Sequence, residues 1–407
     1  MLSPQSKDVI AATLPAVGGA IGEITPLFYS KMFAAHPELE RDLFNRGNQK
    51  VGEQPKALAS SIAAFATLQL DPDPARQHAV LSRIAHKHAS LGVEPDQYKI
   101  VHEHLFAAIV EVLGEAVTPE VAAAWDELYW LMAQALIDME AGLYSAAGLS
   151  RGSEVWREVR VRSRQHESAD TVSFVLTSVD GSPLPSFAPG QYLSVGVPLP
   201  DGARQIRQYS LSSAPQDDWR ITVKRIDAHQ LPDGTEVPAG EVSTYLYNNL
   251  FEDDLLSVTT PFGDLVLPEG DAPLLLVSAG IGCTPMIGML NYLAETGDPR
   301  PVSVLHADRS PSRHAHRAEL NALVERLPSA EIHRWYEDLG VRTPEGDLRL
   351  GRADLADVPV ADGVRALLCG PLPFMEGIRD ALLQKSVPAE HIAYEVFGPD
   401  SWAAAAA

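Results

Sequence analysis

Cysteine is scarce in this chain, which has only Cys283 and Cys369 among its 407 residues. The two lie in separate motifs, so the sequence does not indicate a structural disulfide, and a reducing compartment fits this composition. Residues 1–10 are polar and carry no signal-peptide pattern, so we expect no secretory leader. We therefore expect a cytoplasmic protein.

Positive charge is also in short supply. The chain has 32 Lys and Arg residues against 54 Asp and Glu residues, which leaves a formal net charge of −22. Phosphate binding needs a basic face, so we expect no nucleic-acid partner, and an anionic membrane surface would repel the chain. We find no apolar run long enough to span a bilayer and expect no membrane insertion. Protein partners are left open, with a monomer as the expectation.

The first 150 residues carry a helical pattern. Apolar residues recur there every three to four positions, and no strand-like alternation appears. One such helix face consists of Trp125, Leu128, Met132, Leu136 and Leu143. Residues 146–153 are small and polar, which is typical of a linker. The sequence therefore predicts an all-α domain over residues 1–147.

Two domains that contain β-strands are predicted after the linker. Short β-rich segments separated by Gly and Pro predict an antiparallel β-barrel or sandwich over residues 153–268. Farther along, strands alternate with helical stretches, which is typical of an α/β domain with a parallel sheet, over residues 269–407. The expected strands are 171–176, 192–197, 208–211 and 221–224 in the first domain and 274–277, 302–306, 331–336, 364–369 and 391–397 in the second.

One histidine of the helical domain is a candidate metal ligand. His88 shares a helix face with Leu81 and Ile84, where a lone histidine is more often a core residue than a ligand. Glu140 lies on the apolar face of another helix and needs a partner there, and Tyr98 begins a third amphipathic helix. A Glu and a Tyr that bond the second imidazole nitrogen would tune an iron ligand. A local cap or ion pair for Glu140 fits the same spacing.

The all-helical segment resembles a globin, in particular the globin of flavohaemoglobins. The segments that carry this resemblance are Phe28-Tyr29, Leu43-Phe44-Asn45, Asn48-Gln49, Gln54 with Leu58, Lys87-His88, Pro95-Asp-Gln-Tyr98 and Glu140-Ala-Gly-Leu-Tyr144. The resemblance implies that His88 is the proximal iron ligand, with Tyr98 and Glu140 as its hydrogen-bonding relay. It implies further that Tyr29, on the distal side, donates a hydrogen bond to bound oxygen. The other implied haem-pocket residues are Phe44, Gln54, Leu58 and Lys87.

Two sequence features bear on this haem site. The chain has no Cys-x-x-Cys-His motif, so haem b would be held non-covalently. Pro26 departs from the family pattern just before Tyr29. We expect Pro26 to start the helix that carries Tyr29, with Thr25 as its N-cap.

Two motifs in the middle of the chain suit a flavin. Pro189-Gly-Gln-Tyr192 and Arg207-Gln-Tyr-Ser210 offer aromatic, polar and cationic groups from strands, although each motif alone is weak. In this order they resemble the FAD-binding segments of the ferredoxin-reductase family. Gly240-Glu-Val-Ser243 resembles the phosphate-contacting helix start of that family. The FAD-contacting residues implied are Tyr192, Arg207, Gln208, Tyr209, Ser210, Gly240, Val242 and Ser243.

This middle segment also departs from the family pattern at two places. Residues 227–239 form an insertion, which we expect to loop outward because surface loops tolerate added length. Thr244 stands where flavohaemoglobins usually have Asn.

The C-terminal third carries a candidate nucleotide site. Residues 273–285 form a strand, a Gly-x-Gly turn and a helix start, a pattern that is weak evidence by itself. It precedes Cys369-Gly-Pro and Glu395-Val-Phe-Gly-Pro399, and the full set resembles the nicotinamide domains of ferredoxin reductases. The implied residues are Gly280, Ile281, Gly282, Cys283, Thr284, Pro285, Cys369, Gly370 and Pro371 for NADH or NADPH, and Glu395, Val396, Phe397, Gly398 and Pro399 near the flavin ring.

Five positions leave alternatives open in this segment. Cys283 stands where flavohaemoglobins often carry Gln, and simple packing is the alternative role for both cysteines. The choice between NADH and NADPH also stays open. Asp308 would repel a 2′-phosphate, whereas Arg309 and Arg313 could attract one.

Across the whole chain, the resemblance implies a nitric oxide dioxygenase. NAD(P)H would give a hydride to FAD, FAD would pass single electrons to the haem iron, and bound O2 would react with NO to give nitrate. One alternative is an oxygen-binding or sensing protein, against which the attached reductase argues. The other is a general NAD(P)H-dependent reductase of flavins, ferric iron or peroxides.

Overall fold

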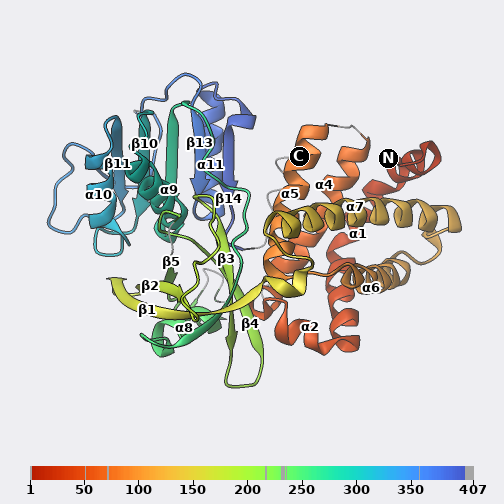
Figure 1. The fold of residues 1–407 in the computed structure, drawn as a ribbon. Helices are drawn as coiled ribbons and strands as arrows, with labels where there is room; N and C mark the ends of the chain where they lie inside the picture. The colour runs from red at the N-terminus through yellow and green to blue at the C-terminus, as the bar shows by residue number, and fades with distance from the viewer. Residues whose placement is uncertain are drawn as a thin grey trace. The chain divides into compact units, whose positions relative to one another are not determined.

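The computed structural model describes residues 2–50, 52–70, 73–215, 218–230, 234, 236–356 and 358–398. Residue contacts divide these into two compact units (Figure 1). Unit 1 comprises Met1–Arg157 and Pro198–Arg207, together with Gly398. Unit 2 comprises Glu158–Val197 and Gln208–Phe397. The three domain boundaries stated above stay a prediction.

The N-terminal part of unit 1 is all-α, as predicted. Its helices are α1 Pro4–Ala35, α2 Pro37–Asp42, α3 Arg46–Lys50, α4 Glu53–Leu70, α5 Pro74–Leu91, α6 Pro95–Leu113 and α7 Pro119–Ala146, with 3-10 turns at Gly114–Ala116 and Gly152–Val155. Proline is the first residue of several of these helices. The N–H groups of the first turn have no partner within the helix, so proline loses no hydrogen bond there. Ser3 and Thr118 cap α1 and α7 through their side chains.

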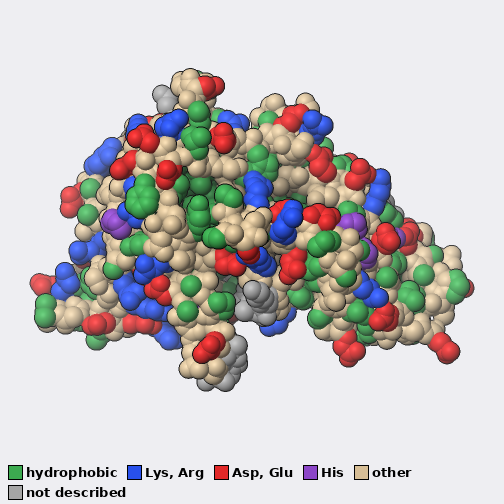
Figure 2. All heavy atoms as spheres, turned by 90° about the horizontal axis from the view of Figure 1, so that it is seen from below, with side chains coloured by type: hydrophobic (Ala, Val, Ile, Leu, Met, Phe, Trp, Pro, Cys, Tyr) green, Lys and Arg blue, Asp and Glu red, His purple; other side chains and the backbone are tan. Residues whose placement is uncertain are grey.

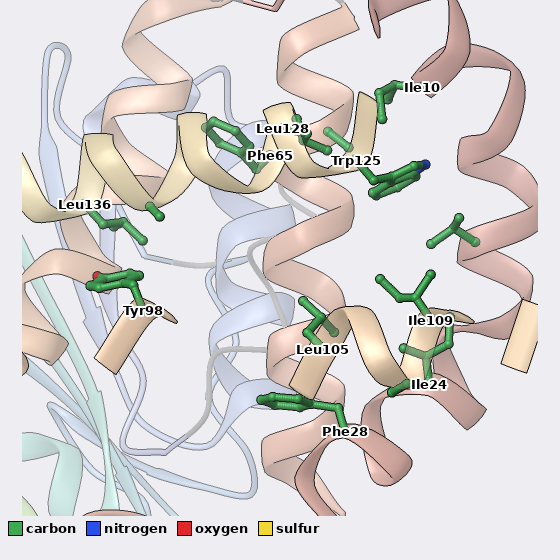
Figure 3. Close-up of a cluster of buried hydrophobic side chains, with 14 of the residues drawn as sticks. Ile10, Ile24, Phe28, Phe65, Tyr98, Leu105, Ile109, Trp125, Leu128 and Leu136 are labelled. Atoms are coloured by element: carbon green, nitrogen blue, oxygen red, sulfur yellow. The ribbon is translucent and has the colours of Figure 1, made fainter. Parts of the chain in front are cut away.

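A continuous hydrophobic core lies between these helices. Figure 3 shows side chains from α1, α4, α6 and α7 that contribute to it, among them Phe28, Phe65, Leu105 and Trp125. Each of these side chains is at most 5% exposed. Burial of a large apolar side chain stabilises a fold by roughly 1.5–3 kcal/mol, so this core orients the polar side chains that the helices also carry.

Helix α1 differs from expectation at Pro26. We expected a new helix to start there with Thr25 as N-cap, but α1 runs through Pro26 without a break. The Thr25 hydroxyl instead donates to the Ile21 carbonyl at 2.9 Å. Proline removes one helical hydrogen bond, but Ile24 and Phe28 are buried on either side of it, and their packing holds one continuous helix.

The composition of α1 also corrects the expectation about long apolar runs. By length and mean hydropathy, α1 is a helix that could cross a membrane, although such evidence is weak because core helices pass the same test. Ile10, Val17 and Ile24 of α1 lie in the hydrophobic core of unit 1. Packing within that unit therefore accounts for part of the apolar character of the helix, since 22% of its most apolar window is buried.

Residues 198–207 belong to unit 1 through a set of polar contacts. The buried Gln205 amide donates to the carbonyl oxygens of Glu40, Arg41 and Phe44 at 3.3, 3.0 and 3.2 Å. Because a buried amide that lost these acceptors would be costly, Gln205 fixes the segment at this place. The sequence pattern had not singled out this residue.

An antiparallel sheet follows the helices, as predicted. Its strands are β1 Trp156–Ser168, β2 Thr171–Ser178, β3 Tyr192–Pro198, β4 Arg204–Ser210, β5 Trp219–Lys224 and β8 Leu255–Thr259, in the order β4-β3-β8-β1-β2-β5. A bridge between Leu211 and Ile221 joins the two edges, so the sheet closes as a barrel. Helix α8 covers Glu241–Asn249.

The insertion at 227–239 contains a small hairpin. Its strands are β6 His229–Gln230 and β7 Glu236–Val237. The residues of the insertion that the structure describes are mostly exposed, in agreement with an outward loop.

The parallel sheet of unit 2 has its predicted alternation of strands and helices. Its strands are β9 Leu274–Ala279, β10 Val302–Asp308, β11 Ala330–Tyr336, β12 Leu348–Leu350, β13 Arg365–Cys369 and β14 Ile392–Glu395, and its helices are α9 Cys283–Thr296, α10 Arg317–Arg326 and α11 Leu372–Gln384, with a 3-10 turn at Ala389–His391. The order β12-β11-β10-β9-β13-β14 reverses direction between β9 and β13. Such a switch point is where open α/β sheets bind ligands.

Surface charge is mixed on the face shown in Figure 2. Lys and Arg side chains there are interspersed with Asp and Glu side chains. This face therefore differs from the uniformly basic faces that bind nucleic acid.

Candidate functional sites

The predicted proximal residues meet in unit 1. His88 Nδ1 lies 2.9 Å from Glu140 Oε1 and 2.9 Å from the Tyr98 hydroxyl, and that hydroxyl donates to Glu140 Oε1 at 2.5 Å. The three side chains come from α5, α6 and α7. Figure 3 shows Tyr98 beside Leu136, one helical turn before Glu140. The local cap that the spacing of Glu140 also allowed is thus not its contact.

Neighbouring residues hold this arrangement in place. A capping box of Glu94 and Gln97 starts α6 directly before Tyr98. The Tyr129 hydroxyl donates to the Tyr98 carbonyl at 2.6 Å, and the Tyr144 hydroxyl donates to the Val93 carbonyl at 2.9 Å. Tyr129 was not singled out from the sequence, because a tyrosine on a helix face carries no signal for a backbone acceptor on another helix.

Burial and charge determine which side chains of the proximal cluster carry protons. Burial, and then the Glu140 carboxylate, raise the pKa of Tyr98, so its phenol stays protonated and donates. Glu140 is 2% exposed and needs donors, which the Tyr98 O–H and the His88 Nδ1–H supply. With Nδ1 engaged, Nε2 is the imidazole nitrogen that carries the lone pair for a metal. Among the described residues, no group of three or more His, Cys, Asp or Glu side chains could itself hold a metal ion.

The predicted distal residues also lie together. Tyr29 on α1 is 5% exposed, and the side chains of Gln54 and Gln49 lie within hydrogen-bonding reach of its phenol. Burial raises the pKa of Tyr29, so the phenol stays neutral and can donate. Gln49 was part of a matching segment but was not predicted as a site residue. Within the described residues its Nε2 is buried without a hydrogen-bond partner, which leaves a donor for a ligand.

The other predicted haem-pocket residues occupy the same core. The ring of Phe44 packs edge-on against Tyr29, with centroids 5.8 Å apart. Leu58 on α4 packs against the core cluster that contains Tyr29 and Tyr98. Lys87 directly precedes His88 on α5 and is half-buried. An apolar core with one oriented histidine and a buried phenol is suited to a haem.

The predicted flavin residues lie on β3 and β4. Tyr192 of β3 is buried, and Gln208 Nε2 donates to Ser194 Oγ at 2.9 Å. Arg207 and Tyr209 are half-buried on the next strand. The Ser210 hydroxyl is buried and has no hydrogen-bond partner within the described part of the chain. A buried hydroxyl in this state is a group that a bound flavin could satisfy.

At the start of α8, the Ser243 side chain hydrogen-bonds the protein backbone. The Ser243 hydroxyl, expected to contact phosphate, accepts from the Ile226 N–H at 3.2 Å and donates to the Gly240 carbonyl at 3.3 Å. Val242 is buried, so only its backbone can meet a ligand. The Thr244 hydroxyl is a buried polar group without a partner among the described residues. The backbone amides of the helix start and Thr244 are therefore the available donors.

The three nucleotide motifs converge at the switch point of the parallel sheet. Register pairs Cys369 of β13 with Ser278 of β9 and with Glu395 of β14. A Cβ on Gly282 would lie 2.3 Å from the Cys369 carbonyl oxygen, so only glycine allows this approach. Gly280 has φ +54°, which also favours glycine. The turn at Gly280–Gly282 and the start of α9 present backbone N–H groups to a pyrophosphate.

The side chains around this turn are mostly buried. Cys283, Thr284 and Pro285 lie inside α9, and burial raises the pKa of both the Cys283 and the Cys369 thiols. Both cysteines are free and buried, and their part in nucleotide binding stays a prediction.

The last predicted motif follows β14. Glu395 ends the strand and is buried, Val396 and Gly398 are half-buried, and the Phe397 ring is 49% exposed. An exposed ring at the carboxyl edge of the sheet is available to stack on a flavin. Pro399, the last predicted residue, lies outside the described residues.

Three family models match consecutive parts of the chain. The globin model matches residues 27–136, the oxidoreductase FAD-binding domain model residues 158–266, and the oxidoreductase NAD-binding domain model residues 276–380. Together they match more than half of the sequence, in the order that the residue patterns predict.

Relatives match along the full length. A flavohemoprotein of Bordetella pertussis is 42% identical over 98% of this chain and 99% of its own length. The solved flavohemoglobin of Malassezia yamatoensis, with FAD and heme bound, is 34% identical, covers 98% of this chain and 100% of its own, and has a TM-score of 0.86. The FAD/NAD-binding domain of a nitric oxide dioxygenase of Vibrio cholerae is 36% identical over 60% of this chain and 100% of its own, with a TM-score of 0.54.

Proposed function

Because the chain belongs to the flavohaemoglobin family, a group of oxidoreductases that bind haem, FAD and a nicotinamide nucleotide, we propose that it is a nitric oxide dioxygenase. It would oxidise NO with O2 to nitrate at the expense of NAD(P)H, and so detoxify NO in the cytoplasm as a monomer. The observation that carries the proposal is the Tyr98–Glu140 pair on His88 Nδ1. A carboxylate that accepts from Nδ1–H makes the imidazole a stronger donor, which suits oxygen activation better than reversible oxygen storage.

The residues around each group fit the cofactors of the family. His88 would ligate the iron through Nε2, and Phe44, Gln54, Leu58 and Lys87 would line the haem pocket. The unpartnered hydroxyls of Ser210 and Thr244 and the amides at the start of α8 would take the flavin, with Phe397 against its ring. When bound, the flavin accepts a hydride and releases single electrons, and the haem iron receives them and binds O2.

The chain's own residues would perform three tasks. Glu140 and Tyr98 orient the His88 ring and hold the proton on Nδ1. The neutral Tyr29 phenol supplies a hydrogen-bond donor on the distal side, beside Gln49 and Gln54. The apolar core around them excludes water, which strengthens each of these interactions.

The proposed activity has a direct test. Purified protein with haem and FAD should consume NADH or NADPH steadily when NO and O2 are both present, and should form nitrate in proportion. Omission of O2 should stop nitrate formation while the protein still reduces an artificial electron acceptor. Rapid acceptor reduction with no NO-dependent nitrate in air would refute the proposal and favour a general reductase.

The variant Glu140→Gln tests the proximal relay. The neutral amide accepts the His88 Nδ1–H bond more weakly than the Glu140 carboxylate does. The His88 imidazole therefore becomes a weaker electron donor to the iron, while it can still ligate the iron. Loss of such an outer-shell partner typically costs about 10- to 100-fold in activity, so NO turnover should fall by that factor with haem retained. The exposed Glu120 lies on the same helix, and Glu120→Gln is the matched control. Unchanged NO turnover and unchanged haem redox potential in Glu140→Gln would contradict the relay.

A further inference from the structure

The loop after β10 lies beside the nucleotide turn. Ala307 of β10 pairs with Ala279 of β9, so Asp308 follows at the same edge of the sheet as Gly280. In dinucleotide-binding folds, an acidic residue near this place hydrogen-bonds the ribose 2′-hydroxyl of NAD, whereas a nearby arginine accommodates the 2′-phosphate of NADP. The orientation of the side chains from Asp308 onward therefore bears on the choice of nucleotide.

The Asp308 carboxylate is turned into the domain. Its side chain is 4% exposed, Oδ1 accepts the Arg309 N–H at 2.6 Å, and Oδ2 lies 3.8 Å from His306 Nε2. His306 is fully buried, stacks on His314 with ring centroids 3.7 Å apart, and has its Nδ1 2.8 Å from Ser278 Oγ. This packing encloses the carboxylate and leaves Oδ2 without a hydrogen-bond partner among the described residues, so Asp308 would bind a ribose hydroxyl only if its carboxylate turned outward.

After Asp308, the loop carries an arginine and two serine side chains at the surface. The backbone carbonyls of Asp308 and Arg309 accept from the Glu337 and Asp338 N–H groups at 3.2 and 2.8 Å, which fixes the end of β10. The Arg309 side chain is exposed, and no hydrogen bond or ion pair of its guanidinium is recorded within the described residues. Ser310 and Ser312 follow, with their hydroxyl oxygens 3.0 Å apart.

Three other charged residues near the loop are already engaged. Arg313 is bound by Asp170 at 2.9 Å. Glu337 pairs with Arg352 at 3.4 Å, and Asp338 accepts the Gly340 N–H at 2.7 Å. Arg309 is thus the cation of this loop that is available to an anion from outside.

We infer that this chain prefers NADPH to NADH, with Arg309, Ser310 and Ser312 as the site of the adenosine 2′-phosphate. The inference rests on the proposed use of a nicotinamide nucleotide at the switch point, and it adds the identity of that nucleotide. Arg309 would bind the phosphate by charge-assisted hydrogen bonds, and the two serine hydroxyls would donate to its other oxygens.

A binding experiment tests the site without catalysis. The full chain with its cofactors is titrated calorimetrically with 2′-AMP and with 5′-AMP as probes. The chain should bind 2′-AMP more tightly than 5′-AMP. Arg309→Ala should lower the affinity for 2′-AMP about ten- to hundredfold and leave the affinity for 5′-AMP unchanged. Arg326→Ala, which removes an equal charge from α10 of the same sheet domain, should leave both affinities unchanged. Equal binding of the two probes, or equal loss in both arginine variants, would overturn the inference.

A kinetic experiment separates this inference from the proposed function. Reduction of an artificial acceptor should show a higher kcat/KM with NADPH than with NADH, and Arg309→Ala should lower only the NADPH value. Asp308→Asn should leave the NADH value unchanged, whereas a selective loss of NADH activity would show that Asp308 binds the ribose. Preference for NADH in the unaltered chain would refute the inference alone. Failure of both nucleotides to support reduction would refute the proposed function as well.

Discussion

Purified His88→Ala protein is expected to contain no haem while its FAD content stays at the level of the unaltered chain. Haem b would be held non-covalently, and His88 Nε2 would ligate its iron because Nδ1 is engaged by Glu140 and Tyr98. His88 belongs to α5 in unit 1, whereas Tyr192, Ser210 and the start of α8 belong to unit 2. The measurement is the ratio of haem to flavin absorbance after purification. The exposed His78 lies on the same helix, and His78→Ala should retain both groups.

A rescue experiment separates loss of the iron ligand from unfolding of the helical core in the His88 variants. Loss of the imidazole leaves Glu140 buried with only Tyr98 as donor, so the helical core will also be destabilised. In His88→Gly, free imidazole added to the buffer should fill the space and restore haem binding, which an unfolded core could not do. Haem retention in His88→Ala would remove His88 from the iron site. Equal loss of haem and FAD would show that the two groups do not depend on separate parts of the chain.

Sequence periodicity predicted the burial of side chains on helices with one apolar face. The period of α7 placed Glu140 among buried apolar residues, and the structure buries it to 2% exposure. A buried carboxylate requires donors, and the resemblance to flavohaemoglobins implied that His88 and Tyr98 are its partners. The strand-turn-helix pattern at 273–285 likewise predicted β9 and the turn at Gly280–Gly282.

Other features depend on information that periodicity does not contain. Helix α1 continues through Pro26 because core packing on both sides outweighs one lost hydrogen bond. Gln205 finds three carbonyl acceptors about 160 residues earlier in the chain, and no local pattern specifies such partners. The Asp308 carboxylate is turned inward beside a stacked pair of histidines, a neighbourhood that its position in the sequence does not specify.

In Tyr29→Phe, dissociation of O2 from the reduced protein is expected to become about ten- to hundredfold faster. Bound O2 carries partial negative charge, so a neutral phenol that donates to it should retain it by roughly 1.5–3 kcal/mol. The raised pKa of Tyr29 keeps that donor protonated, and Gln49 and Gln54 lie within hydrogen-bonding reach of the same hydroxyl. The substitution removes one oxygen atom and leaves the ring in its contacts with Phe28 and Phe44. The measurement is stopped-flow displacement of O2.

Two comparisons within the same variant distinguish a ligand contact from a general change of structure. Carbon monoxide is less polar when bound, so its dissociation should change much less than that of O2. Reduction of an artificial acceptor by NAD(P)H should not change, because the nucleotide and flavin residues other than Arg207 and Gly398 belong to unit 2. An equal effect on both gases would indicate altered access to the pocket. An O2 dissociation rate equal to that of the unaltered chain would mean that the phenol does not reach the ligand, and the distal role of Tyr29 would fail.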